Sequence, residues 1–119
     1  MEYMFLIHTD VSSTPADPAS EGFEELMAAW FAYNQVLVDG HHFIAGASLQ
    51  PAATATTVST TASGRPDAVV DGPYAETKED IGGFYVVRAD DLDQALDLAR
   101  AMPGAASVEV RPLMFRPDA

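Results

Sequence analysis

Hydrophobic residues recur along this chain with two different periods, one typical of helices and the other typical of strands. Between residues 21 and 39 they return every three or four positions, which predicts a helix that stops at Gly40. Asp17 or Ser20 is the expected side chain at the start of that helix. The same period between residues 90 and 104 predicts a second helix.

Strands are predicted where short aromatic and β-branched runs lie between turn residues. The insertion at residues 51–71 is rich in Ala and Thr and contains a turn at residues 63–66. It is interpreted as a β-hairpin, although this composition also fits a flexible loop. The predicted strands are residues 3–8, 41–49, 56–61, 68–71, 81–88 and 107–115.

The order of these elements predicts an α+β fold, the ferredoxin-like βαββαβ plait with an extra β-hairpin, as a single domain over residues 1–119. Right-handed crossovers would place both helices on one face of the sheet and leave the other face open. The first strand is apolar on both faces, because Tyr3, Phe5 and Ile7 alternate with Met4 and Leu6. We therefore expect the open face to pack on a second copy, giving a homodimer in the form of a dimeric α+β barrel.

Composition excludes several classes of function. The chain has no cysteine, which excludes disulfides, thiolate metal sites and a cysteine nucleophile. Its formal net charge of −12 argues against binding to nucleic acid or to an anionic membrane. No apolar run approaches the length of a membrane helix and the N-terminus lacks a signal-peptide pattern, so a cytoplasmic protein is expected.

The segment Asp71–Glu79, followed by Ile81–Tyr85, closely resembles the DGPF-motif members of the YCII-related family. This resemblance implies a dimeric α+β barrel with clefts near the motif, and it implies little chemistry. Genes of such proteins often lie beside those of alternative sigma factors, which keeps a regulatory role open. The similarity continues in the segments Leu49–Pro51, Ala53–Val58, Asp91–Ala95 and Val108–Pro112.

Some YCII-related proteins resemble small-molecule enzymes that use a His–Asp pair. In them the Asp follows the first strand and the His lies on the first helix. Asp10 matches the position of that Asp, but the helix predicted at residues 21–39 contains no histidine. The pair that the resemblance implies therefore lacks its base in this chain.

Another acid–base group is predicted where the first strand ends, because the strand that begins at Ile81 should run antiparallel beside it. His8 or Asp10 could then act as a base and Lys78 could attract a small anionic or polar ligand. The alternative is that His8 only packs and that Lys78 belongs to a solvated run of charges. The candidate catalytic residues are His8, Asp10, Asp71 and Lys78, and the candidate ligand-binding residues are Tyr74, Glu76, Gly82 and Gly83.

The remaining candidates have simpler interpretations. His41 and His42 are adjacent in a predicted strand and point to opposite faces, so neither a metal nor any other cofactor is expected. Trp30 and Tyr33 have helical spacing, which favours core packing over a cleft. Asp71 could simply satisfy the backbone of its own turn. Three classes of function remain open: a small-molecule enzyme of isomerase, lyase or dehalogenase type, a non-catalytic regulatory protein, and a structural dimer.

Overall fold

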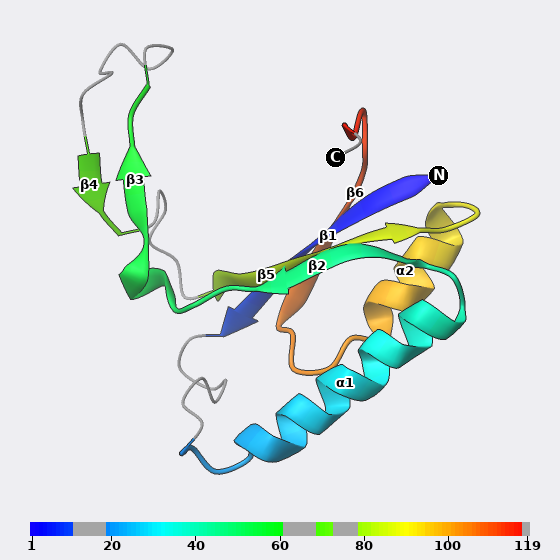
Figure 1. The fold of residues 1–119 in the computed structure, drawn as a ribbon, viewed down its shortest axis with the longest axis horizontal. Coiled ribbons are helices and arrows are strands. Elements are labelled where there is room, and N and C mark those ends of the chain that lie inside the picture. The colour runs from blue at the N-terminus through cyan, green and yellow to red at the C-terminus, as the bar shows by residue number, and fades with distance from the viewer. Residues whose placement is uncertain (11–18, 61–68, 73–78, 118–119) are drawn as a thin grey trace.

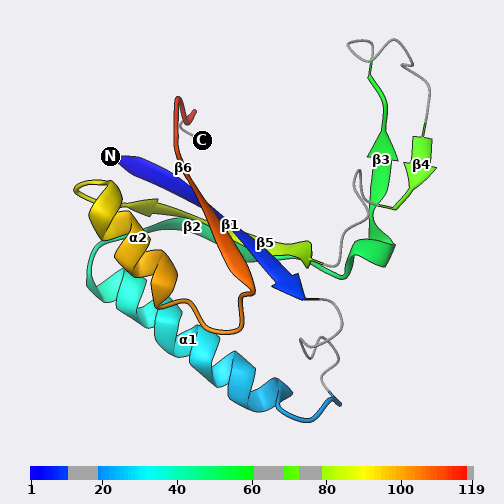
Figure 2. The ribbon, with the colours of Figure 1, turned by 180° about the vertical axis from the view of Figure 1, so that it is seen from behind.

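The computed structural model describes residues 1–10, 19–60, 69–72 and 79–117. Its main sheet is antiparallel and has the strand order β2-β5-β1-β6. Both helices cover the same face of this sheet (Figures 1 and 2). This is the α+β, ferredoxin-like plait that the order of the elements predicts. The elements are β1 (Glu2–Asp10), α1 (Phe23–Asp39), β2 (Phe43–Ser48), a short 3-10 helix η1 (Ala52–Thr54), β3 (Thr56–Val58), β4 (Val69–Asp71), β5 (Glu79–Arg88), α2 (Leu92–Arg100) and β6 (Ser107–Pro112).

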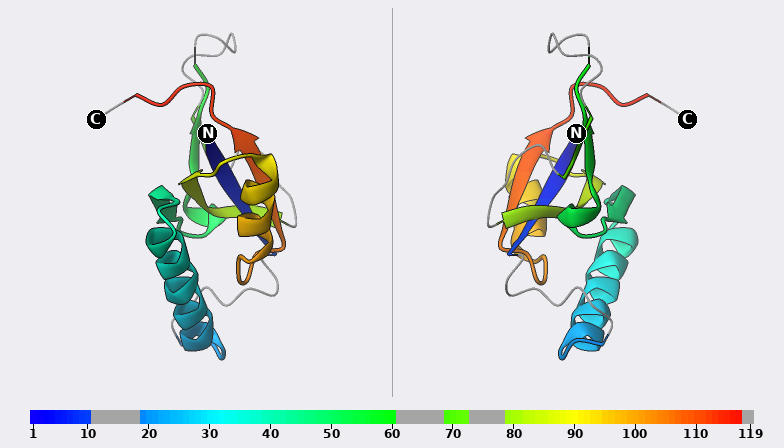
Figure 3. Two further views of the ribbon diagram at one scale, coloured as in Figure 1. Left: turned by 90° about the vertical axis from the view of Figure 1, so that its right-hand side faces the viewer. Right: turned by 90° about the vertical axis from the view of Figure 1, so that its left-hand side faces the viewer.

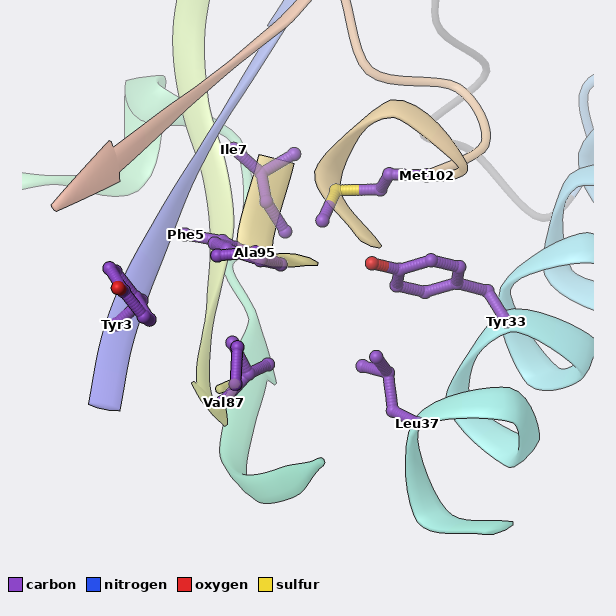
Figure 4. Close-up of a cluster of buried hydrophobic side chains, with 9 residues drawn as sticks. Tyr3, Phe5, Ile7, Tyr33, Leu37, Val87, Ala95 and Met102 are labelled. Carbon is purple, nitrogen blue, oxygen red and sulfur yellow. The ribbon is translucent and has the colours of Figure 1, made fainter. Parts of the chain in front are cut away.

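The core lies between the helices and the central strand β1. Phe5 pairs with Tyr85 of β5 on one side and with Val110 of β6 on the other. The side chains of Tyr3, Phe5 and Ile7 are buried, whereas the residues between them are only partly covered. Figure 4 shows this buried row of β1 beside side chains from both helices. The predicted apolar row on each face of the first strand is confirmed, and only the row that faces the helices is fully buried.

Helix α1 is capped differently at its start than the sequence predicts. Its N-cap is Gly22, in a left-handed conformation and without a side-chain hydrogen bond. Ser20 contributes only its backbone carbonyl, which accepts a hydrogen bond from the amide of Phe23 at 3.2 Å. The prediction of Ser20 as a side-chain cap is therefore wrong, and Asp17 lies outside the described residues. The predicted stop at Gly40 is confirmed.

Two aromatic residues of α1, Trp30 and Tyr33, pack in the core. The hydroxyl of Tyr33 donates a hydrogen bond of 2.6 Å to the carbonyl of Leu98 in α2. The rings of Trp30 and Tyr33 meet edge to face with centroids 6.1 Å apart, and both contact Tyr85 of β5. This confirms the interpretation of Trp30 and Tyr33 as packing residues, and it ties the two helices to the sheet.

The insertion forms a β-hairpin, as predicted, but its first strand ends at Val58, before the predicted end at residue 61. The predicted turn at residues 63–66 lies outside the described residues. Strands β3 and β4 have three residues each, and Val58 pairs directly with Val69. The hairpin stands away from the main sheet on the side opposite the helices (Figures 1 and 2). At its base the amide of Gly72 donates to the carbonyl of Ala55 at 2.6 Å. Gly72 has a φ of 109°, a conformation that favours glycine.

Candidate functional site

The end of β1 lies beside the start of β5, as the sequence predicts. His8 pairs with Ile81 and Asp10 pairs with Glu79. A bulge between Ile7 and His8 shifts the register by one residue just before this point. Because Glu79 closes the segment that begins at Asp71, the pairing brings the end of that segment to the end of β1.

His8 is held between two strands. On its other side it pairs with Ser107 of β6, and its carbonyl accepts a hydrogen bond from the amide of Ala106 at 2.9 Å. Its side chain is half-buried and alternates with the buried residues of β1, so it lies on the open face of the sheet. An imidazole in this position can accept or donate a proton at the end of an otherwise apolar row.

Gly82 and Gly83 allow close contacts at the same end of the sheet. A Cβ on Gly83 would lie 2.6 Å from the carbonyl oxygen of Ala47 in β2, and one on Gly82 would lie 2.9 Å from the side chain of Thr9. Thr9 also donates through Oγ1 to the carbonyl of Asp80 at 3.3 Å. Gly83 therefore admits the backbone of β2, and the contact of both glycines with a ligand stays a prediction.

Asp71 belongs to the hairpin, not to the main sheet. It ends β4, pairs with Thr56 and is exposed to solvent. The described residues show no contact between Asp71 and His8, so their participation in one site stays a prediction. Four further predicted site residues lie outside the described part of the structure, namely the side chain of Asp10 and the residues Tyr74, Glu76 and Lys78.

The other two histidines lie at the opposite end of the sheet. The Nδ1 atom of His42 is 2.7 Å from the carbonyl oxygen of Arg88, and Arg88 pairs with Glu2 at the start of β1. His8 is therefore far from His41 and His42 along the sheet. These two residues belong to the turn between α1 and β2, so the prediction that they lie in a strand is wrong. Within the described ranges, no three His, Asp or Glu side chains converge as metal ligands.

Comparison with known proteins places the chain in a family. The family model of the YCII-related domain matches residues 1–114. The chain belongs to the YCII-related family. It is also 38% identical over 122 residues to the uncharacterized protein R00369 of Rhizobium meliloti (strain 1021), an alignment that covers 98% of this chain and 96% of that protein. The DGPF-motif subtype is consistent with this result, and neither comparison assigns an activity.

This YCII-related chain carries a charged cluster that the sequence analysis missed. Glu2 accepts hydrogen bonds from Arg116 at 2.9 and 3.3 Å, and Arg88 lies 3.9 Å from the same carboxylate. The hydrogen bond from Arg116 is the main reason that the pKa of Glu2 lies below its usual value. Glu2 and Arg116 are 114 residues apart, and no spacing rule connects such positions.

The structure also has a surface hollow of about 290 Å³ between α2 and β6. Apolar side chains dominate its lining, and no acidic side chain lines it, so it offers no acid–base pair. Sequence periodicity could not reveal it, because the same residues are typical of a packed helix face. Its apolar lining residues are Leu96, Ala99, Met102, Ala105, Ala106, Val108 and Val110.

No helix in the described part of the chain is both long and apolar enough to cross a bilayer.

Proposed function

We propose that this YCII-related chain is a cytoplasmic homodimer that binds a small anionic or polar ligand where β1 ends and β5 begins. The observation that carries the proposal is the pairing of Asp10 with Glu79 and of His8 with Ile81. It brings Glu79, the residue that follows Lys78 in the sequence, to the end of β1 that carries the half-buried His8. The proposal adds Lys78 to this site because it is adjacent to Glu79 in the chain.

The proposed chemistry is proton transfer on the bound ligand, as in isomerases, lyases or dehalogenases. His8 or Asp10 would remove the proton, and Lys78 would attract the negative charge of the ligand. The chain has only six lysines and arginines, so few of its residues could attract an anionic ligand to the base. Asp71 would complete the acid–base group, with the ligand contacting Tyr74, Glu76, Gly82 and Gly83.

The open face of the sheet supports the homodimer. Met4, Leu6 and Phe84 lie on this face and are only partly covered by their own chain. An apolar sheet face of this kind is stabilised when a second copy covers it. Light scattering at micromolar concentration should give about twice the chain mass of 12.7 kDa. A monomer across that range would overturn the dimer.

A thermal-shift screen of small polar and anionic compounds tests the ligand site. A compound present at 100 times its dissociation constant should stabilise the wild type by about 2.7 kcal/mol. His8→Asn and Lys78→Met should lose this stabilisation. Each has a matched control: His41→Asn changes a histidine at the far end of the sheet, and Arg100→Met removes another exposed cation.

The result would contradict the proposal if compounds bind and both site variants keep their full thermal shift, because the site would then lie elsewhere.

The rival function is a non-catalytic regulatory protein that acts with an alternative sigma factor. The partly covered apolar face supports this rival equally well. If no small molecule changes the melting temperature and the chain instead forms a complex with a purified sigma factor, the regulatory function is favoured.

A further inference from the structure

The β3–β4 hairpin has an apolar surface that its own chain does not cover. Val58 and Val69 pair directly, so their side chains share one face, and they are 57% and 62% exposed. Within the described residues the two strands hydrogen-bond as a sheet only with each other. A two-stranded ribbon alone is marginally stable in water, so this ribbon gains stability when another surface covers it.

The C-terminal segment at residues 113–117 has a similar apolar surface. Met114 is fully exposed and Phe115 is 78% exposed. Two contacts with Glu2 nevertheless fix the segment in place: the amide of Leu113 donates to its carbonyl at 2.9 Å, and Arg116 binds its carboxylate. A large apolar side chain held outside the core in this way is typical of a contact with another molecule.

These two apolar elements flank the open face of the sheet. The hairpin and the C-terminal segment both rise on the side opposite the helices, the hairpin beyond one end of the strands and the C-terminal segment near the other (Figures 1 and 3). The partly covered row of Met4, Leu6 and Phe84 lies on the face between them. Exposed or partly covered apolar side chains therefore lie at both ends of this face and in the row between them.

We propose that the β3–β4 hairpin of each copy docks against the C-terminal segment of a second copy of this chain. The inference rests on the homodimer proposed above and specifies its arrangement. Two identical sheets that pack face to face are related by a two-fold axis lying between them. An axis along the strands would put hairpin against hairpin, whereas an axis across the strands puts each hairpin against the partner's C-terminal segment.

Charge favours the axis across the strands. At the hairpin end, β1 ends at Asp10, β4 ends at Asp71 and β5 begins with Glu79 and Asp80, so this end of the described sheet is acidic. At the other end, the described residues of the open face and the C-terminal segment include three arginines, Arg88, Arg111 and Arg116, beside two glutamates, Glu2 and Glu109. An axis across the strands places the acidic end of one copy over the basic end of the other, while an axis along the strands would oppose acid to acid.

Cross-linking tests the arrangement, and the absence of native cysteine removes any background. We expect a mixture of Val58→Cys and Met114→Cys chains to form a covalent dimer with a short bifunctional maleimide, and each variant alone to form none. Val36→Cys, on α1, mixed with Met114→Cys is the matched control, because Val36 is 58% exposed. Efficient linking by Val58→Cys alone would overturn the proposed axis.

A second measurement covers the energetics. Val58→Thr combined with Val69→Thr keeps the β-branched shape but places hydroxyls in both docked hairpins, so the dimer dissociation constant should rise about tenfold or more. Val36→Thr should leave it unchanged. If the hairpin substitutions leave the dimer dissociation constant unchanged, the proposed docking is wrong, although the homodimer itself is not. A chain that is monomeric in light scattering overturns the homodimer, and the docking with it.

Discussion

His41 adopts a backbone conformation that few side chains favour. It has a φ of 61° just after the end of α1. The amide of His42 donates to the carbonyl of Leu37 at 2.8 Å, and the amide of His41 donates to Val38 at 3.1 Å. This is the Schellman arrangement, in which the left-handed position is usually glycine. The preceding Gly40 has no room for a side chain, because a Cβ there would lie 2.7 Å from the ring of His42.

We therefore expect His41→Gly to stabilise the protein by about 0.5–1 kcal/mol. The relief of left-handed strain outweighs the extra entropy that glycine gives to the unfolded chain. Urea unfolding of the two proteins measures the difference. Gly40→Ala is the control and should destabilise. A His41→Gly protein that unfolds at lower urea than the wild type would show that its imidazole makes contacts worth more than the strain.

Glu2 gives the C-terminal segment a dependence on pH. Its pKa is lowered in the folded state, chiefly by the hydrogen bond from Arg116. The charged form of Glu2 therefore contributes fully to stability when the pH is above the usual glutamate pKa of 4.5. That contribution is lost as the pH falls through the lowered pKa. NMR signals of Phe115 and Arg116 should therefore stay constant from pH 7 to about pH 5 and shift only at more acidic pH. Glu2→Gln should remove that acidic transition, and a transition that persists would assign it to another carboxylate.

At the level of elements, one hydrogen bond joins the two helices over the sheet. The buried hydroxyl of Tyr33 donates to Leu98 at 2.6 Å, and burial raises the pKa of this tyrosine above its ordinary value. The hydroxyl therefore stays a donor even where exposed tyrosines ionise. Tyr33→Phe would leave the carbonyl of Leu98 without this donor.

We expect Tyr33→Phe to lower the free energy of unfolding by about 1–2 kcal/mol, the usual cost of an unsatisfied buried acceptor. Tyr85→Phe is the matched control and should cost less, because its hydroxyl makes a longer bond of 3.4 Å to the side chain of Asn34. Urea unfolding of both variants provides the comparison. Equal losses would mean that ring packing, and not the hydrogen bond, determines the effect.

At the level of the whole molecule, net charge controls how readily two copies associate. Each chain carries a formal charge of −12, so two chains repel one another at low ionic strength. In the proposed dimer, the complementary ends of the open face would set the orientation, and the net repulsion would weaken the association. Sedimentation in about 0.01 M and 0.15 M salt should show tighter association at the higher concentration, because screening becomes stronger. Weaker association in salt would mean that the local ion pairs dominate.

The order of the elements could be predicted because each depends on neighbours in sequence. The period of three to four residues identified both helices, and Gly40 marked the end of the first. The prediction of a side-chain cap at Ser20 failed because the helix begins after Gly22, which adopts a left-handed conformation. No pattern of side chains in the sequence predicts that conformation. The first hairpin strand was predicted too long, since Ala and Thr runs carry a weak strand signal.

The amino-acid sequence by itself determined the ferredoxin-like order of strands and helices, the apolar row on each face of β1 and the place of His8 at its end. Periodicity and turn residues act within a few positions, so these features can be inferred one segment at a time. Only the tertiary structure decided that Gly83 lies against Ala47, that His8 lies between Ile81 and Ser107, and that Arg116 holds Glu2. Those contacts join residues far apart in the chain, and they depend on strand register and packing, which the spacing of residues within one segment does not encode.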